Sequence, residues 1–265
     1  MGWSQRRWLL QNRLSADAPW PLDVARHILD SADSTNAHGL RLAPTLTGPA
    51  WFLAHEQTAG RGRRARSWIS PRGNFHATLI LRPIEPASVV ALRSFAAALA
   101  LRQALVAVTG LPDAFALKWP NDVLLNGGKV AGILLESQSA GAGVAHLAIG
   151  IGVNLRAAPE GTAVEPGAVR PVSLLAETGQ SVTPEAFLDH LAPAYAHWEA
   201  VFQTRGFAPL RQEWLGHAAR LGQTIRARTG DVSREGRFET IDATGALILA
   251  QARGQVAISA AEVFF

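Results

Sequence analysis

The sequence predicts an α+β protein, in which a mixed, largely antiparallel sheet flanked by helices is followed by a small all-β domain. Two observations predict this class. Through most of the chain, apolar runs of strand length alternate with segments of helical spacing. After about residue 218 the chain changes to short alternating runs separated by glycine-containing turns. We therefore expect a first domain over residues 1–217 and a second over residues 218–265.

The most regular helical pattern covers residues 87–108. Its apolar side chains recur at helical spacing among many alanines, and Gly110 follows as a stop signal. A second, shorter helical segment is predicted at residues 37–42, because residues 30–36 before it are rich in helix-capping types. Two further helical patterns lie at residues 184–202 and 209–217.

Five apolar runs have the length and composition of strands: residues 51–56, 74–83, 115–125, 129–137 and 145–155. The third run contains Pro120, which places a turn between its apolar halves. The third and fourth runs are joined by Asn126-Gly127-Gly128, a strong tight-turn signal. This arrangement favours a sheet made largely of antiparallel neighbours.

The remaining segments complete the outline. Residues 156–171 are rich in proline, glycine and alanine without periodicity, which predicts a long surface loop. The C-terminal domain is predicted to be a small barrel, because four short alternating runs follow one another at 224–228, 236–241, 246–250 and 255–259.

Composition narrows the class of protein. With 265 residues, 48% of them hydrophobic and 17% charged, the chain has the composition of a soluble globular protein. Its formal charge is only +4, and much of the basic excess lies in one loop, which favours a local anion site over a nucleic-acid surface. The absence of cysteine excludes disulfides, thiolate zinc sites and cysteine nucleophiles. We found no window of membrane-spanning length.

The N-terminus bears on localisation. Arg6-Arg7 followed by Trp8-Leu9-Leu10 is faintly similar to an export signal, but no apolar stretch of the required length follows. We therefore predict a cytoplasmic protein.

Residues 60–68, GRGRRARSW, are the most unusual segment. Glycine lets backbone N–H groups approach a ligand, and arginine offers forked donors to carboxylate or phosphate. Such a loop suits a small anion, and because its charges repel one another we expect it to be mobile when empty and ordered when filled. A solvated basic loop or a nucleic-acid patch is the alternative.

A second polar cluster, KWPND at residues 118–122, is followed by Lys129. Lys118 and Asp122 could hold a phosphate and its magnesium, although a turn that caps its own backbone explains each residue singly. A turn explains Lys129 less well, because this lysine begins an apolar strand, where burial of its charge would be unfavourable.

Two further segments leave alternatives open. The side chains of residues 34–36, Ser-Thr-Asn, could bind a polar uncharged group or cap a helix. Trp68 could stack on a purine or belong to the core.

Over nearly its whole length the sequence resembles the biotin protein ligases, also called biotin–[acetyl-CoA-carboxylase] ligases. Five motifs stand in that family's order: STN at 34–36, EQTAGRGRRARSW at 56–68, KWPND at 118–122, GKVAGIL at 128–134 and GIGVNL at 150–155. The resemblance implies a class II synthetase-like catalytic domain with an SH3-like C-terminal barrel. It also implies the short form of the family, since only some thirty residues precede Asp33, too few for an N-terminal DNA-binding domain.

The resemblance also implies the roles of individual residues. It places biotin against Ser34, Thr35, Asn36, Gln57, Gly60, Arg61, Gly62, Arg63, Lys129 and Gly132. It assigns ATP and the adenylate to Trp68, which would carry the adenine, and to Lys118, Asn121, Asp122 and Asn154. Lys129, Arg63 and Lys118 are the implied catalytic residues, and Asp122 the implied ligand of Mg²⁺.

The reaction implied by the resemblance has two halves. Biotin and ATP give biotinyl-5′-AMP and pyrophosphate, and a lysine of the biotin carboxyl carrier domain of acetyl-CoA carboxylase or a similar carboxylase then takes the biotin and releases AMP. We expect no DNA or membrane partner, and a monomer or homodimer. One departure concerns the loop, because the family usually has glycine where this chain has Ala65, so that this position either needs no positive φ or bends differently here.

Three other readings remain. The first is a lipoate- or octanoate-transferring enzyme on the same fold. The second is a nucleic-acid-binding module that uses the arginine loop. The third is a biotin sensor that transfers nothing. The separate motifs at 118–122 and 128–134 argue against the last two.

Overall fold

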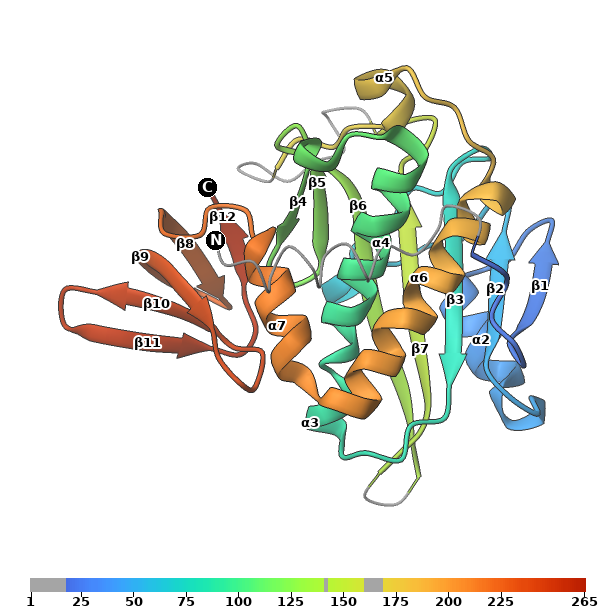
Figure 1. Cartoon of the computed structure of the whole chain (residues 1–265), viewed down its shortest axis with the longest axis horizontal. Helices are drawn as coiled ribbons and strands as arrows, with labels where there is room; N and C mark the ends of the chain where they lie inside the picture. The colour runs from blue at the N-terminus through green and yellow to red at the C-terminus, as the bar shows by residue number, and fades with distance from the viewer. Residues whose placement is uncertain (1–17, 141–142, 160–168) are drawn as a thin grey trace.

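The computed structural model describes residues 18–140, 143–159 and 169–265. Its larger part is a seven-stranded sheet with the strand order β1-β2-β3-β7-β6-β5-β4 (Figure 1). Only the edge pair β1–β2 is parallel, and the other five pairs are antiparallel, which confirms a mixed, largely antiparallel sheet. The strands are β1 (Ala25–Leu29), β2 (Ala50–Ala54), β3 (Phe75–Leu81), β4 (Phe115–Lys118), β5 (Asp122–Leu125), β6 (Gly128–Ala140) and β7 (Gly143–Val153).

Helices cover both faces of this sheet. In Figure 1, α4 (Arg93–Thr109) and α6 (Pro184–Arg205) cross in front of it, with α7 (Phe207–Gly216) beside them. The short helix α2 (Thr35–Leu42) packs on the opposite face. Alternation along β3 decides which side chain serves which face: Phe75 joins the core under α4 and α6, and Ile80 joins the smaller core under α2.

The central helix departs from the sequence prediction in two ways. Residues 87–109 form two helices, α3 (Ala87–Val90) and α4, and α4 ends at the left-handed Gly110 as predicted. Contrary to the expectation from sequence, this segment does reach the length and apolarity of a membrane span, with a mean hydropathy of 1.6 in its best window. Two thirds of that window (67%) is buried inside the fold. Its apolar character is therefore used in packing against α6 and the sheet.

The tight turns of the sheet follow the sequence signals. Asn126 and Gly127 both have positive φ, at 49° and 81°, as a two-residue hairpin between β5 and β6 requires. The run 115–125 divides at its Pro120 turn into β4 and β5, and Lys118 pairs with Asp122 across that turn. The sheet thereby brings the polar cluster at 118–122 beside Lys129, which lies near the start of β6.

A separate five-stranded antiparallel sheet forms the C-terminal part, in the order β11-β10-β9-β8-β12. Its strands are β8 (Thr224–Thr229), β9 (Val232–Ile241), β10 (Leu247–Gln251), β11 (Gly254–Ile258) and β12 (Glu262–Phe264). The sequence predicted the first four but not β12. Nor did it predict β1 or the short helix α5 (Leu174–Thr178). The division at residues 217/218 stays a prediction, and it lies between α7 and β8.

The long loop predicted at 156–171 falls partly outside the described residues, which omit 160–168; the N-terminal segment with Arg6-Arg7 lies outside them as well. On its C-terminal side, Pro171 forms an isolated parallel bridge with Lys129. The backbone N–H of Lys129 donates to Arg170, and its carbonyl accepts from Val172. These bonds hold the segment around residue 171 against the start of β6.

Candidate active site

A cavity of about 280 Å³ brings the predicted site residues together. Its wall contains Ser34, Thr35, Asn36, Gln57, Arg61, Gly62, Arg63, Trp68, Lys118, Asn121, Asp122, Lys129, Gly132 and Asn154. Gly60 alone among the predicted residues is not in the wall. A Cβ at Gly60 would lie 2.4 Å from the carbonyl oxygen of Trp68, so this glycine lets the base of the loop close on itself.

One end of the cavity is a chain of neutral hydrogen-bonding groups. Gln57 Oε1 accepts from the backbone N–H of Thr35 at 2.8 Å, and Gln57 Nε2 donates to the Ser70 hydroxyl at 2.8 Å. Ser34 precedes α2 at the N-cap position, yet its side chain makes no capping bond. The capping explanation of residues 34–36 therefore does not account for Ser34, whose buried side chain lines the cavity instead.

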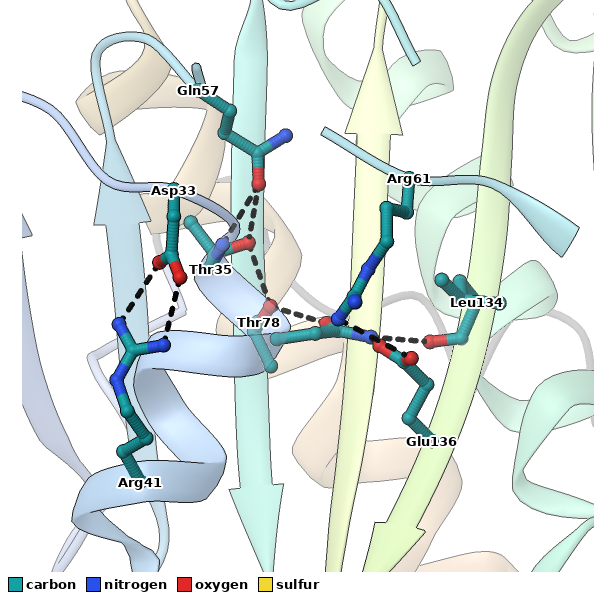
Figure 2. A network of polar contacts seen from close by, with 9 residues as sticks. Asp33, Thr35, Arg41, Gln57, Arg61, Thr78, Leu134 and Glu136 are labelled. Atoms are coloured by element: carbon teal, nitrogen blue, oxygen red, sulfur yellow. Dashed lines mark hydrogen bonds and ion pairs between the residues drawn. The ribbon is translucent and has the colours of Figure 1, made fainter. Parts of the chain in front are cut away.

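Asn36 is held in a fixed orientation by three partners, Thr78, Leu134 and Glu136, which Figure 2 labels. Its Nδ2 donates to Glu136 Oε2 at 2.8 Å and to the Leu134 carbonyl at 3.3 Å, while its Oδ1 accepts from the Thr78 hydroxyl at 2.6 Å. The Thr78 hydroxyl also lies 2.8 Å from that of Thr35. The Thr35 hydroxyl in turn donates to Gln57 Oε1 at 3.1 Å.

Thr78 and Glu136 were not predicted as site residues. Thr78 is fully buried on β3, on the face that carries α2, and Glu136 lies on β6, where Arg61 Nη2 approaches its Oε1 at 3.5 Å (Figure 2). The signal in the sequence was a threonine within the apolar run 75–81. In a strand that alternates between two packed faces, such a residue must have a buried partner.

The opposite end of the cavity carries the lysines. Lys129 Nζ lies 2.7 Å from Asp122 Oδ1, and Lys118 Nζ lies 3.6 Å from Asp122 Oδ2. Burial alone would raise the pKa of Asp122, but the charges of Lys129 and Lys118 outweigh it, and the pKa lies below its usual value. Burial also lowers the pKa of Lys118, against the opposing charge of Asp122. Two cations are thus held around one carboxylate.

Arg63 reaches from the loop toward the same end. Its Nη1 lies 3.4 Å both from Asn121 Oδ1 and from the carbonyl oxygen of Ala261 in the C-terminal domain. Burial lowers the pKa of this guanidinium, and the nearby charge of Arg64 adds to the effect. Even so, a guanidinium stays charged at neutral pH.

Trp68 lies between the two ends. Its indole is half-buried and faces Gly152, where a Cβ would come within 2.5 Å of the ring. Lys129 Nζ lies 5.6 Å from the ring centroid, within cation–π range. The buried Nε1 has no hydrogen-bond partner among the described residues. The core alternative for Trp68 therefore describes it poorly, since it forms part of the cavity wall.

The loop resolves the question about Ala65. Both Arg64 and Ala65 are left-handed, with φ of 56° and 57°. This chain therefore keeps a positive φ at the position where the resembling family usually has glycine, and accepts the steric cost of an alanine there. The structure shows one conformation of the loop, so the expectation that it is mobile when empty stays a prediction.

The implied metal ligand Asp122 does not by itself fit a metal site. Each of its oxygens faces a lysine ammonium group, at 2.7 and 3.6 Å. Among the described residues, no group of three or more His, Cys, Asp or Glu side chains could hold a metal ion.

Asn154 is buried at the rim of the lysine end. Its Nδ2 donates to the Val172 carbonyl at 3.1 Å, and its backbone N–H donates to Val130 at 2.8 Å. These bonds tie β7 to the segment beside Lys129. Its predicted contact with the nucleotide stays a prediction.

Comparison with known proteins identifies the family of this chain. Residues 29–154 match the biotin/lipoate A/B protein ligase family, and residues 221–265 match the biotin protein ligase C-terminal domain. The chain is 59% identical to a biotin–[acetyl-CoA-carboxylase] ligase of Paracoccus denitrificans over 90% of this chain and 99% of that protein. It is 30% identical to the bifunctional ligase/repressor of Escherichia coli, over 84% of this chain and 68% of the relative.

Among solved structures, the biotin protein ligase from Aquifex aeolicus in complex with biotin and ATP superposes with a TM-score of 0.77. It shares 26% sequence identity, and the match covers 90% of this chain and 97% of that one. The match extends over the catalytic sheet and the C-terminal domain together, which confirms the predicted fold class. The chain belongs to the biotin protein ligase family.

Proposed function

We propose that this protein activates biotin with ATP as biotinyl-5′-AMP and transfers the biotin to a lysine of a carboxylase carrier domain. The observation that carries the proposal is the cavity with two unlike ends. Thr35, Asn36 and Gln57 provide neutral hydrogen-bonding groups at one end, and Lys118 and Lys129 provide cations at the other. Such a cavity suits a ligand with a polar neutral head and a negatively charged tail.

The cations reduce the electrostatic repulsion between the two anionic reactants of the first half-reaction. The biotin carboxylate must approach the α-phosphorus of ATP, and two unit charges about 4 Å apart repel by roughly 4 kcal/mol at an effective dielectric near 20. Lys118, Lys129 and Arg63 surround this end of the cavity. Their charges lower the repulsion and stabilise the negative charge that develops on the phosphorus oxygens as pyrophosphate leaves. No protein nucleophile is required.

Asp122 gives these cations their positions. Asp122 is the counterion of both lysines. A phosphate that enters the cavity competes for the same ammonium groups, so Lys129 can exchange one anion for the other without leaving the site. Asp122 thus positions the lysines, and Mg²⁺ is proposed to enter with the triphosphate of ATP.

Trp68 and the loop serve the intermediate. The indole forms a flat apolar surface on which the adenine of the adenylate can stack, directly beside Lys129. Arg61 and Arg63 project from the loop into the cavity wall above the biotin end and the phosphate end respectively. A loop in this position excludes water from the mixed anhydride until a carrier lysine attacks its carbonyl carbon and AMP leaves.

The matched family also includes lipoate ligases. The two functions can be distinguished by the carboxylic acid that the enzyme activates. Biotin has a ureido ring that can use the bonds of Thr35, Asn36 and Gln57, whereas lipoate and octanoate have no such group. The test is ATP–pyrophosphate exchange with biotin, lipoate or octanoate as the acid. We expect exchange with biotin, and exchange with lipoate or octanoate but not biotin would contradict the proposal.

The proposal extends to cellular context. We propose a cytoplasmic protein with no DNA or membrane partner, acting as a monomer or homodimer, and a division into domains at residues 217/218. The low formal charge of +4, much of whose basic excess lies in the loop, supports the absence of a DNA partner.

A further inference from the structure

The C-terminal domain contributes one carboxylate to the arginine loop. Glu262, the first residue of β12, accepts from Arg64 at 2.8 Å and pairs with Arg66 of the loop, and also with Arg228 of β8 at 2.8 Å. Its side chain is only 18% exposed. The hydrogen bond from Arg66 is the largest of the effects that lower the pKa of Glu262 to about 2. This carboxylate is therefore ionised at any physiological pH.

The loop needs such support because its backbone is strained. Arg64 and Ala65 are consecutive non-glycine residues with positive φ. Each left-handed residue costs roughly 1–2 kcal/mol, and strained backbone persists only where the surroundings hold it. Ala65 has no side chain long enough to make a compensating contact. The bonds of its neighbours Arg64 and Arg66 to Glu262 therefore add to the backbone bonds within the loop, which run from the Gly62 N–H to Arg66 and from the Arg66 N–H to Arg63.

The domain that carries Glu262 is itself fixed to the catalytic sheet. Leu117 of β4 exchanges backbone hydrogen bonds with His217 and Ala219 in the connection between the two parts. The indole Nε1 of Trp119 donates to the Gly245 carbonyl of the C-terminal domain at 3.1 Å. Glu262 consequently stands at a defined place beside the cavity, whose wall it joins.

We propose that Glu262 is a positioning residue for the arginine loop: by holding Arg64 and Arg66, the C-terminal domain limits how often and how far the loop opens in the absence of substrate. The contact from Arg63 Nη1 to the Ala261 carbonyl, at 3.4 Å, acts in the same direction. All four arginines of the loop line the cavity. This inference rests on the proposed function only for its catalytic consequence, since the restraint on the loop needs no substrate.

The first test measures loop order in the ligand-free protein. Trypsin cleaves after arginine, so the rate of cleavage after Arg66 reports how often the loop opens. Glu262→Gln removes the charge from both loop contacts. A loss near 1 kcal/mol corresponds to about fivefold faster cleavage. Glu239→Gln is the matched control, because Glu239 lies in the same domain and accepts from Gln255 away from the loop.

A second variant keeps the test decisive if Glu262→Gln perturbs the domain through Arg228. Arg64→Gln removes one of the two loop contacts from the loop side and leaves the pairing of Glu262 with Arg228 in place. It should accelerate cleavage after Arg66 in the same direction but by less. Cleavage rates equal to wild type in both variants would overturn the proposal.

The catalytic consequence is read separately. With biotin and ATP but no carrier, Glu262→Gln should release biotinyl-AMP about fivefold faster than Glu239→Gln, measured as biotin on the lysines of an added bystander protein. Faster cleavage together with unchanged release would overturn the catalytic role of Glu262. Absence of adenylate in wild type would instead reject the proposed function and leave the cleavage result standing.

Discussion

Lys129 and Asp122 form the closest ion pair of the phosphate end, with 2.7 Å between Nζ and Oδ1. Asp122 is nearly fully buried, and Lys118 lies beside its other oxygen. With Arg63, three cationic side chains therefore stand around one carboxylate at this end of the cavity. The excess positive charge can attract and bind an incoming triphosphate.

Replacing Lys129 should therefore damage chemistry more than folding. Lys129→Ala leaves Asp122 paired with Lys118, and we expect adenylate formation to slow by on the order of a hundredfold, the usual scale for losing a charge that stabilises a transition state. Biotin-dependent ATP–pyrophosphate exchange measures it. Unchanged exchange in this variant would reject the role of Lys129.

Arg63 links the loop to the nucleotide end, so its loss should free the intermediate. Arg63→Ala removes the contacts to Asn121 and Ala261. We expect faster release of biotinyl-AMP, detected as label on bystander lysines. Retention of the adenylate as in wild type would count against the loop as a barrier to water.

The buried hydroxyl of Thr78 should affect biotin binding through Asn36, to which it donates a hydrogen bond. Thr78→Val keeps the volume but leaves Asn36 Oδ1 without its donor, and an unsatisfied buried acceptor costs about 1–3 kcal/mol. We expect KM for biotin to rise about tenfold while KM for ATP changes little. Thr204→Val, which removes an exposed hydroxyl on α6, is the control. Equal KM values in the two variants would show that Thr78 does not orient the biotin end.

Position 65 tests the cost of the left-handed turn. Glycine adopts positive φ freely, whereas a β-branched residue there is a strong outlier. Ala65→Gly should bind biotin at least as tightly as wild type, and Ala65→Val should bind it more weakly, as measured by calorimetry. Equal affinities for all three proteins would mean that the loop does not keep this backbone when biotin binds.

His76 should make stability depend on pH. Burial lowers the pKa of His76 to about 4, with a weaker opposing effect from the Pro71 carbonyl. In the unfolded chain the pKa is about 6.5, so acid favours unfolding as pH falls from that value toward the folded pKa. Between pH 7.5 and 5 the contribution is about 2 kcal/mol. His76→Phe should reduce the loss of unfolding free energy over this range, and an identical loss would contradict the assignment.

The arginine loop and the lysine-bearing turns could be predicted because their functional residues are adjacent in the sequence. Long helices and apolar strands followed from spacing. By contrast, β1 is exposed along most of its length and carries no alternating pattern, and β12 has three residues, too few for a periodicity. Helical length and apolarity at residues 87–109 did not distinguish a core helix from a membrane span; burial does.

The missed site residues share a different cause. Thr78 and Glu136 acquire their roles from the register of β3 and β6 against β7, which places them around Asn36. Glu262 lies 198 residues from Arg64 in the sequence. Local patterns do not encode a meeting over that separation, so only the folded chain reveals it.

The transfer of biotin to a carrier lysine is the most direct test of the proposed function. Wild-type protein is incubated with biotin, ATP, Mg²⁺ and a biotin carboxyl carrier domain, and the mass of the carrier is measured, with a carrier whose acceptor lysine is replaced by arginine as control. We expect one biotinyl group on the acceptor lysine, dependent on ATP and absent from the control. The proposed function would be contradicted if a carrier that a known ligase can biotinylate gained no mass with this protein.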